Sequence, residues 1–577
     1  MKTLKSTIAL SLLAAGVLSC AHQATADLVL VNGRVYTLAW PEPEPEGRPA
    51  AGAPHDASGW RPDADTIAIA GTRVVFVGRQ SDAPKLAPAG RSVDLKGATV
   101  IPGLVDSHVH LANLGAALER VNLVGAATEG DAVGRVVERA ASVSKGEWIV
   151  GWGWDEGAWT SHLPDMRLLS ARVPDHPVVL HGLHSFAVWG NRLAFERAGI
   201  TRDTPAPPGG EIKKAANGEP TGVLLNNAAA LLTAALPPPS PTQLQERVVR
   251  ALAAMAAHGY TSVHEAGADA PLLAVLEDLD RAGRLPLPVN AMIAARDTAL
   301  IDAWRARQPT AAGRPLTVRS VKAFYDGAMG SRGAFFLEPY TDRPDHHGVG
   351  GAEYGFDRER LAAMMTAGYQ VTIHAIGDRA NRESLDFFEA VLAKSPAARA
   401  TRPRIEHAQV VSPADLPRFA ALGVIASVQP SHAVEDMAWA EARIGPERIK
   451  GAYAWRSLRR AGARLVLNSD LPGTDYDIFY GLHSAVTRAN REGQPKGGWR
   501  PEEALTIEET LRGWTVWAAY AGFREQQAGT IAAGHSADLT VMDLDPFQVG
   551  ETAPARLLGG RIVMTIANGR VVYTIGP

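Results

Sequence analysis

Five helical patterns that end at a glycine and continue at once into a β-branched strand constrain the fold of this chain more than any other feature. The glycines are Gly259, Gly283, Gly368, Gly423 and Gly462. A glycine just past a helix end, followed directly by a strand, is typical of the short loop that joins a helix to a strand. The chain has 577 residues, of which 46% are apolar and 21% charged, so it can bury a large core. The repeated pattern therefore predicts an α/β fold built from helix–strand units.

Eight short apolar segments alternate with the predicted helices. Their near-continuous apolar character is typical of parallel strands that are covered on both faces. Eight such strands predict a (β/α)8 TIM barrel over residues 101–529, with a doubly wound open sheet as the alternative. The segments span residues 99–108, 261–265, 285–293, 316–325, 370–375, 402–408, 424–429 and 464–470.

Two further units are predicted outside the barrel strands. Short Val-rich segments in residues 27–100 and 530–577 predict one small β-sandwich domain built from both ends of the chain. About 150 residues separate the first barrel strand from the second, far more than one crossover helix needs. Residues from about 111 to 260 contain helix starts and strands of their own, so we expect an inserted subdomain there, over the mouth of the barrel.

The first 26 residues are typical of an export signal. Lys2 and Lys5 precede an apolar run, residues 8–18, that is too short to span a bilayer. VLSC at 17–20 resembles a bacterial lipobox, which would leave Cys20 as a lipidated N-terminus. Residues 24–26, Ala-Thr-Ala, fit ordinary cleavage instead. The lipobox is the preferred interpretation. Both predict an exported protein, and the lipobox predicts a periplasmic lipoprotein that contacts the membrane only through its lipid anchor.

Composition excludes several classes of chemistry. A formal net charge of −3 gives no reason to expect a nucleic-acid partner bound through a basic surface. Cys20 is the only cysteine of the chain, so disulfides, a thiolate zinc site and a cysteine nucleophile are excluded from the folded body. Any metal chemistry must therefore use histidine, carboxylate or a rarer ligand.

Six residues with metal-binding or acid–base side chains fall on or next to the predicted barrel strands. His108 and His110 are two residues apart on the first strand, so both imidazoles lie on one face. Catalytic groups of TIM barrels gather at the C-terminal ends of the strands, so these residues are expected to form a single site. The other four are Lys322, His374, His407 and Asp470, on the fourth, fifth, sixth and eighth strands.

The order and position of these residues resemble those of the binuclear members of the amidohydrolase superfamily. Further motifs are similar to its amidohydrolase 3 subgroup, which includes N-substituted formamide deformylases. The resemblance runs from about Asp27 to the C-terminus. The motifs are GWGWDEGAW (151–159), PTGVLL (220–225), KAFYDGAMGSRGA (322–334) and AGTIAAGHSADLTVMD (528–543).

The resemblance implies a ligand set and a reaction. It assigns His108 and His110 to one metal ion, His374 and His407 to a second, and a carbamylated Lys322 to the bridge between them. A CO2-derived carbamate replaces the repulsive charge of a protonated lysine with an anionic ligand. Two divalent ions, zinc or alternatively Mn, Fe or Co, would lower the pKa of a shared water. Asp470 would act as general base and acid in the hydrolysis of an amide-type C–N bond, of an N-acyl or N-formyl substrate for example.

Several alternatives stay open. The same site could act as a lactonase or esterase. The alternative that is not an enzyme is a catalytically silent binding lipoprotein. A small-molecule substrate is expected, and a homodimer is only a family expectation. Five residues could contact substrate, although packing or a supporting hydrogen bond explains each of them equally well. They are Trp154, His184, Arg332, Gln429 and His432.

Overall fold

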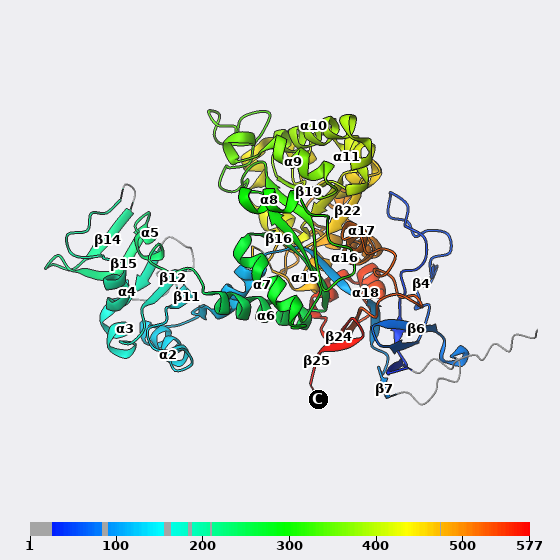
Figure 1. Ribbon diagram of the computed structural model, residues 1–577, viewed down its shortest axis with the longest axis horizontal. Coiled ribbons are helices and arrows are strands. Elements are labelled where there is room, and N and C mark those ends of the chain that lie inside the picture. The colour runs from blue at the N-terminus through cyan, green and yellow to red at the C-terminus, as the bar shows by residue number, and fades with distance from the viewer. Residues whose placement is uncertain are drawn as a thin grey trace, which may run out of the picture.

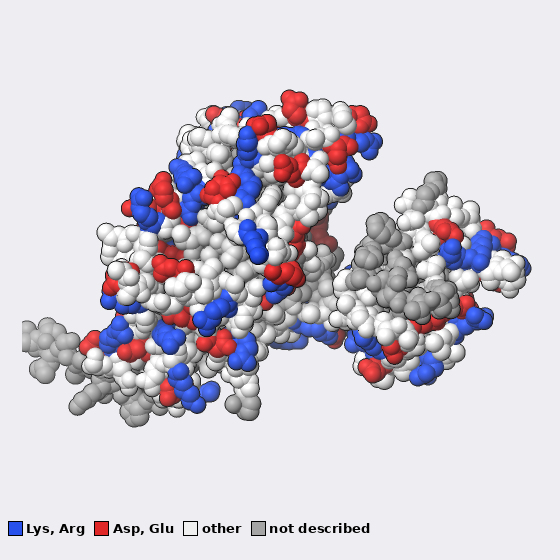
Figure 2. Space-filling view, turned by 180° about the vertical axis from the view of Figure 1, so that it is seen from behind, with Lys and Arg blue, Asp and Glu red and all other residues white. Residues whose placement is uncertain are grey.

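The computed structural model describes residues 26–83, 90–154, 163–182, 187–207, 210–473 and 475–576. The predictions for Cys20 and His184 lie outside the described residues. Figure 1 shows a barrel at the centre, an inserted unit to its left and a small β unit at its lower right. Acidic and basic side chains are interspersed over the face shown in Figure 2. No helix within the described ranges is long and apolar enough to span a membrane.

Eight parallel strands form the barrel, so the TIM-barrel prediction is confirmed and the open-sheet alternative is wrong. The strands are hydrogen-bonded in sequence order, with the first and last at the two ends of the sheet order. They are β9 (Leu104–Val109), β16 (Tyr260–Ala268), β17 (Val289–Ala294), β18 (Leu316–Phe324), β19 (Gln370–Ala375), β20 (Arg404–His407), β21 (Ile425–Val428) and β22 (Arg464–Leu467).

The predicted helix–glycine–strand units are present. Each of the five glycines follows a helix and has a positive φ, between 63° and 96°, which glycine adopts without steric cost. The five helices are α6 (Pro241–Ala257), α7 (Ala270–Arg281), α9 (Arg358–Thr366), α11 (Leu416–Leu422) and α14 (Trp455–Arg460). Further helices are α8 (Thr298–Arg305), α10 (Asp378–Lys394), α12 (Pro430–Asp436), α13 (Ala440–Arg448), α15 (Ile478–Thr487), α16 (Ile507–Trp514), α17 (Val516–Ala521) and α18 (Pro546–Thr552).

The first predicted barrel strand is in fact two strands in two different sheets. β8 (Thr99–Pro102) belongs to the small β unit, and only β9 belongs to the barrel. The break falls at Gly103, whose N–H donates to the carbonyl of Asp538. A Cβ at this position would lie 2.3 Å from Oγ1 of Thr261, so the two sheets approach each other closely here.

Side-chain and backbone hydrogen bonds join β9 to the residues that follow β22 and close the barrel. Val109 and Leu471 form an isolated parallel bridge. Asp106 accepts a hydrogen bond from the hydroxyl of Ser469 at 2.6 Å and another from its N–H at 3.2 Å. The N–H of Asp470 donates to the carbonyl of His108. The seam therefore places the end of the first strand against the end of the eighth.

Strands from both ends of the chain make up the small β unit. A four-stranded sheet has the order β6-β5-β1-β7, and a five-stranded sheet has the order β2-β8-β23-β24-β25. Apolar side chains of both sheets, among them Leu30, Ile67, Val100, Leu539 and Ile566, form one buried cluster. The strands are β1 (Leu28–Val31), β2 (Arg34–Val35), β5 (Thr66–Ala70), β6 (Arg73–Gly78), β7 (Arg91–Asp94), β23 (Leu539–Met542), β24 (Ile562–Ala567) and β25 (Arg570–Thr574). A separate two-stranded sheet pairs β3 (His55–Asp56) with β4 (Gly59–Trp60).

The inserted unit, which we call the insert, is a six-stranded sheet with helices, covering residues 121–236. Its sheet order is β10-β11-β12-β13-β15-β14. The flanking helix α1 (Leu111–Glu119) lies against α6 at the barrel, so the insert proper begins after α1. Its elements are β10 (Val121–Asn122), α2 (Glu129–Ala140), β11 (Ile149–Trp154), α3 (Met166–Arg172), β12 (Val178–Gly182), β13 (Ala187–Gly190), α4 (Arg192–Arg197), β14 (Gly210–Lys214), β15 (Pro220–Asn226) and α5 (Ala229–Thr233).

The insert lies to the left of the barrel in Figure 1, and its expected placement over the mouth of the barrel stays a prediction. Asn191 organises its core with four hydrogen bonds. Its amide nitrogen donates to the carbonyls of Val173 and His176, and its amide oxygen accepts from the N–H groups of Val178 and Ala194. The insert therefore has a core of its own and does not need the barrel to bury its apolar side chains.

Candidate functional site

A cavity of about 370 Å³, which we call the histidine cavity, lies at the C-terminal ends of the barrel strands. No described residue of the insert lines it. Phe324, Met329 and Trp439 contribute apolar surface, and Glu435 and Asp436 line it from α12. All six residues predicted from the strand ends line this cavity together with a seventh: His108, His110, Lys322, His374, His407, His432 and Asp470.

His108, His110 and Asp470 form a first cluster of potential metal ligands. The Nε2 atoms of His108 and His110 lie 3.4 and 3.3 Å from the same oxygen, Oδ1 of Asp470. One ligand atom from each residue lies within 4.8 Å of the others. The i, i+2 spacing of His108 and His110 at the end of β9 turns both rings to one side, as the sequence predicted. The seam to β22 brings Asp470 beside them.

A buried ion pair orients His108. Nδ1 of His108 lies 2.7 Å from Oε2 of Glu406, and the guanidinium of Arg404 contacts both carboxylate oxygens, at 2.6 and 2.9 Å. Burial raises the pKa of Glu406, but the charge of Arg404, together with His108 and Lys322, outweighs burial and holds the pKa well below its ordinary value. The anionic carboxylate keeps a proton on Nδ1, which leaves the lone pair of Nε2 facing the cavity.

His407, His432 and Asp470 form a second cluster. Nδ1 of His407 lies 3.1 Å from Oε1 of Gln429, whose amide nitrogen donates to Asn468 at 2.7 Å. Nε2 of His432 lies 3.9 Å from Oδ2 of Asp470, the oxygen that does not face the first cluster. These ligand atoms also lie within 4.8 Å of one another. The amide of Gln429 therefore fixes the ring of His407 in the way that Glu406 fixes His108.

His374 lies between the clusters and a buried carboxylate. Its ring centre is 4.4 Å from that of His407. Its Nε2 is buried, has no hydrogen-bond partner among the described residues and lies 3.6 Å from Oδ1 of Asp326. Asp326 is itself fixed, because it accepts hydrogen bonds from the N–H groups of Phe335, Ile376 and Gly377.

Lys322 is fully buried, with its Nζ 3.0 Å from Nε2 of His108. Burial is the main cause that lowers its pKa below the ordinary value for lysine. A lysine in this position is therefore more easily neutral than one at the surface. A neutral amine is the form that reacts with CO2.

The electrostatics of the histidine cavity suit a divalent cation. Burial lowers the pKa of His108 to about 4 and that of His374 to about 3, and it holds the pKa of His407 well below 6.5. Burial raises the pKa of Asp470, but the surrounding histidines outweigh it and keep the carboxylate ionised. Neutral imidazoles beside one carboxylate are ligands that Zn and related ions accept. The residues present therefore fit the expected metal ions.

Four of the five residues suggested as substrate contacts are described by the structure, and they have different surroundings. His432 belongs to the second cluster, and Gln429 supports His407. The structure does not place Trp154 in the histidine cavity, because its ring is buried in the insert core and its Nε1 donates to the carbonyl of Leu180. Arg332 is not among the residues that line the cavity either, and it pairs with Asp342 at 2.8 Å.

Sequence reasoning missed Glu406 and its partner Arg404. Two charged residues at i and i+2 in an otherwise apolar barrel strand share one face, and a charge buried inside a barrel needs a partner. That pattern in RIEHA was a usable signal for a supporting ion pair.

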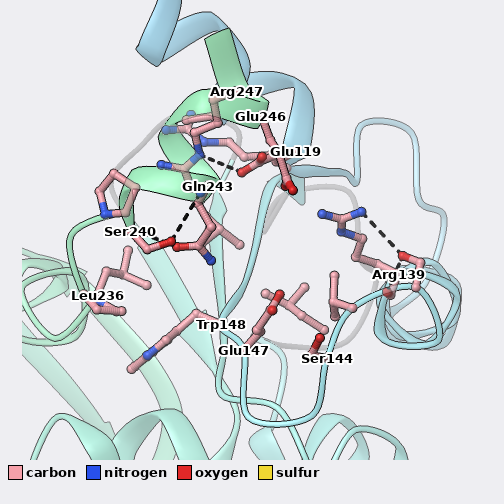
Figure 3. Close-up of a pocket in the computed structure, with 18 of the residues that line it drawn as sticks. Glu119, Arg139, Ser144, Glu147, Trp148, Leu236, Ser240, Gln243, Glu246 and Arg247 are labelled. Atoms are coloured by element: carbon pink, nitrogen blue, oxygen red, sulfur yellow. Dashed lines mark hydrogen bonds and ion pairs between the residues drawn. The ribbon is translucent and has the colours of Figure 1, made fainter. Parts of the chain in front are cut away.

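A larger cleft of about 870 Å³, which we call the insert cleft, lies between the insert and helices α1 and α6. Figure 3 shows Glu119, Arg247, Gln243 and Ser240 on one side of it and Glu147, Trp148 and Ser144 on the other. Nε of Arg247 and Nη1 of Arg250 lie 2.8 and 2.7 Å from the carboxylate of Glu119. This cleft shares no lining residue with the histidine cavity, and no cluster of metal ligands was found in its described residues.

Comparison with known proteins shows consistent similarity over most of the chain. Residues 91–573 match the amidohydrolase family. The protein YtcJ of Bacillus subtilis (strain 168) is 31% identical over 506 residues, which are 84% of this chain and 91% of YtcJ. The N-substituted formamide deformylase of Arthrobacter pascens is 29% identical over 536 residues, 88% of this chain and 95% of the deformylase. The crystal structure of an uncharacterized metal-dependent hydrolase from Pyrococcus horikoshii OT3 has a TM-score of 0.70 and 27% identity, and it covers 91% of this chain and 99% of its own.

Proposed function

The chain belongs to the amidohydrolase family, and on that premise we propose that it is an exported hydrolase with two divalent cations that cleaves an amide-type C–N bond of a small molecule. One observation carries the proposal. Histidines from the first and sixth strands and from α12 converge on one carboxylate, Asp470, in a cavity at the strand ends that His374 of the fifth strand also lines. Polar groups that converge in this way at the strand ends of a TIM barrel form its active site.

When bound, two divalent cations lower the pKa of a shared water toward neutrality and polarise the substrate carbonyl. The protein's own residues prepare this chemistry by fixing the orientation of each imidazole. Glu406 and Gln429 hold the Nδ1 atoms of His108 and His407, so that the opposite nitrogens face the cavity. Rings that are already oriented lose little freedom when they bind an ion.

Lys322 supplies an anionic bridge after reaction with CO2. The neutral Nζ would attack the carbon of CO2, one C=O π bond would open onto its oxygen as the C–N bond forms, and solvent water would take up one N–H proton to give a carbamate. The buried position of Lys322 supports this modification, since it favours the neutral amine. The 3.0 Å separation from His108 Nε2 places the lysine beside the first cluster.

Asp470 transfers the proton. It is ionised at neutral pH, so it can accept a proton from the attacking water and return it to the leaving nitrogen. An amine is a poor leaving group without that proton. The cavity of about 370 Å³ has room for a small amide, N-acyl, N-formyl or cyclic, against Phe324 and Trp439.

Export is proposed from the N-terminal sequence. Lys2 and Lys5, the apolar run and Cys20 support a lipid-anchored periplasmic protein. Labelling of cells with a fatty-acid analogue, for the wild type and for Cys20→Ser, tests this. We expect label only in the wild type.

A substrate panel tests the proposed reaction. Purified protein loaded with Zn²⁺ is assayed against N-formyl, N-acyl and cyclic amides and against lactones, and the same assays are repeated after chelation and dialysis. We expect amide hydrolysis that is lost on chelation and restored by Zn²⁺. Hydrolysis of lactones alone would replace the amidase proposal with an esterase one, and activity that persists in protein shown to be free of metal would refute both.

A further inference from the structure

His432 stands out because it does not lie on a barrel strand. It is the third residue of α12, which follows β21 directly after Gln429. His432 therefore lies outside the pattern of residues at the strand ends. Its side chain nevertheless lines the histidine cavity, and 18% of it is exposed. Its neighbours Ser431 and Ala433 are buried, which anchors this turn of the helix against the barrel.

Separations between ligand atoms are the strongest evidence about the two clusters. Two ligands that each lie about 2.1 Å from one tetrahedral ion are about 3.4 Å apart, and no two such ligands exceed about 4.2 Å. In the first cluster the two separations to Oδ1 of Asp470 are 3.4 and 3.3 Å. Nε2 of His432 lies 3.9 Å from Oδ2. That separation is too long for a hydrogen bond but within the span of a shared ion.

His407 has only one nitrogen left for such an ion. Its Nδ1 contacts Gln429, so its Nε2 is the available ligand. The rings of His407 and His432 lie nearly parallel, with 7° between their planes and 5.8 Å between their centres. This spacing is too wide for direct stacking of the two rings. Two imidazoles side by side at this distance can both reach a point beside Oδ2 of Asp470.

We propose that His432 is a ligand of the second cation, which it holds together with His407 and Oδ2 of Asp470. Asp470 thereby contributes one oxygen to each cation. This inference rests on the proposed function, since it extends the ligand set of the same metal centre by a residue outside the strand-end pattern. The class of ion is a divalent cation that accepts imidazole and carboxylate, such as Zn²⁺ or Co²⁺.

Ion counting tests the assignment without any need for a substrate. Wild type, His432→Ala and Glu435→Gln are stripped of metal, reloaded with Zn²⁺ and passed through a desalting column, and the bound zinc is measured by elemental analysis. Glu435 is a matched control, because it lies on the same helix and lines the same cavity but belongs to neither cluster. We expect two ions per chain in the wild type and in Glu435→Gln, and one ion in His432→Ala.

Two further measurements separate ligation from a structural role. His432→Asp replaces the imidazole with another ligand type and is expected to recover the second ion, whereas His432→Asn is not. In Co²⁺-loaded protein the visible absorption of His432→Ala is expected to fall to about half. If His432→Ala does not fold, the Asp and Asn variants decide the question.

The outcomes are distinguishable. If His432→Ala and His432→Asn bind as many ions as the wild type, with the same affinities, His432 is not a ligand and the proposed function stands. A wild type with one ion that all His432 variants retain also overturns the assignment. A wild type that binds no ion refutes the proposed function and the assignment together.

Discussion

The histidine cavity is smaller than the insert cleft but contains the potential metal ligands. Volume alone would therefore select the wrong one of the two as the functional site. The cleft is more than twice as large, at about 870 Å³ against about 370 Å³. In the cleft, the carboxylate of Glu119 already pairs with two arginines. In the cavity, imidazole nitrogens from four histidines gather around both oxygens of Asp470, and for three of them the separation is 3.3 to 3.9 Å. Potential metal ligands that converge on one carboxylate identify a functional site, and volume does not.

The largest expected effect is at Asp470. Asp470→Asn keeps the volume of the side chain but removes its charge and its ability to accept a proton. We expect kcat/KM to fall by about 10³-fold or more, measured on the amide that the substrate panel identifies. Ion content is measured on the same preparation. Activity within tenfold of the wild type would contradict the proton-transfer role.

The next effect should be confined to the insert. Asn191→Ala leaves four buried backbone groups without partners, so we expect the insert to lose about 3 kcal/mol of its stability. Hydrogen exchange should rise in residues 121–236 while zinc content stays at the wild-type level. The matched change in the barrel is Asn381→Ala, whose amide donates to the carbonyls of Ala375 and Gly377 beside the fifth strand. That variant should lose zinc, and equal zinc loss in both variants would show that the two regions are not independent.

A smaller effect depends on pH. Burial, and secondly the charge of Arg404, lower the pKa of His264 in the folded protein to about 3. Above pH 6.5 neither state binds a proton there. As the pH falls from 6.5 toward 3, the unfolded chain takes up a proton that the folded chain does not, so the free energy of unfolding falls. The loss is about 2 kcal/mol at pH 5.

Urea denaturation at pH 7.5 and pH 5 measures this effect. The loss of stability between the two values should be smaller in His264→Gln than in the wild type by about 2 kcal/mol. His181, which is half-buried in the insert cleft, is the comparison, since burial lowers its pKa as well. We expect His181→Gln to change the pH dependence less. An unchanged pH dependence in His264→Gln would contradict the buried, neutral state of His264.

The smallest effect is expected in the insert cleft. Glu119→Gln breaks the pairs with Arg247 and Arg250, whose side chains are 25% and 43% exposed. Partly exposed ion pairs contribute about 1 kcal/mol or less. We expect kcat/KM within about twofold of the wild type and a small shift of the melting temperature. A large loss of activity would mean that the cleft, and not only the cavity, takes part in the reaction.

The barrel was predictable because its signals are local. A glycine after a helix followed by a β-branched strand specifies a helix–strand junction within about ten residues, and five of the eight barrel strands follow such a junction. The break at Gly103 was not predictable in this way. TVIPGLVDSH is one apolar run, and only the close approach of Thr261 and Asp538 divides it between two sheets.

The site was predictable where the potential ligands lie on a barrel strand or within three residues of its end, and not where they lie on a helix. His108, His110, His374 and His407 follow from strand positions. His432 enters the cavity from a helix, so its place depends on how α12 turns away from β21, which no residue spacing encodes. The insert was expected from its length, but its position relative to the barrel depends on how α1 lies against α6, a contact between segments far apart in the sequence.

The seam between β9 and β22 determines when the proposed metal centre is complete. His108 and His110 emerge from the ribosome some 360 residues before Asp470, the residue to which both clusters converge. A nascent chain that stops short of the eighth strand has the imidazoles but no shared carboxylate. If the proposed ions bind, their uptake would report that the ring of strands is complete, and the bound pair would hold its first and last strands together against unfolding.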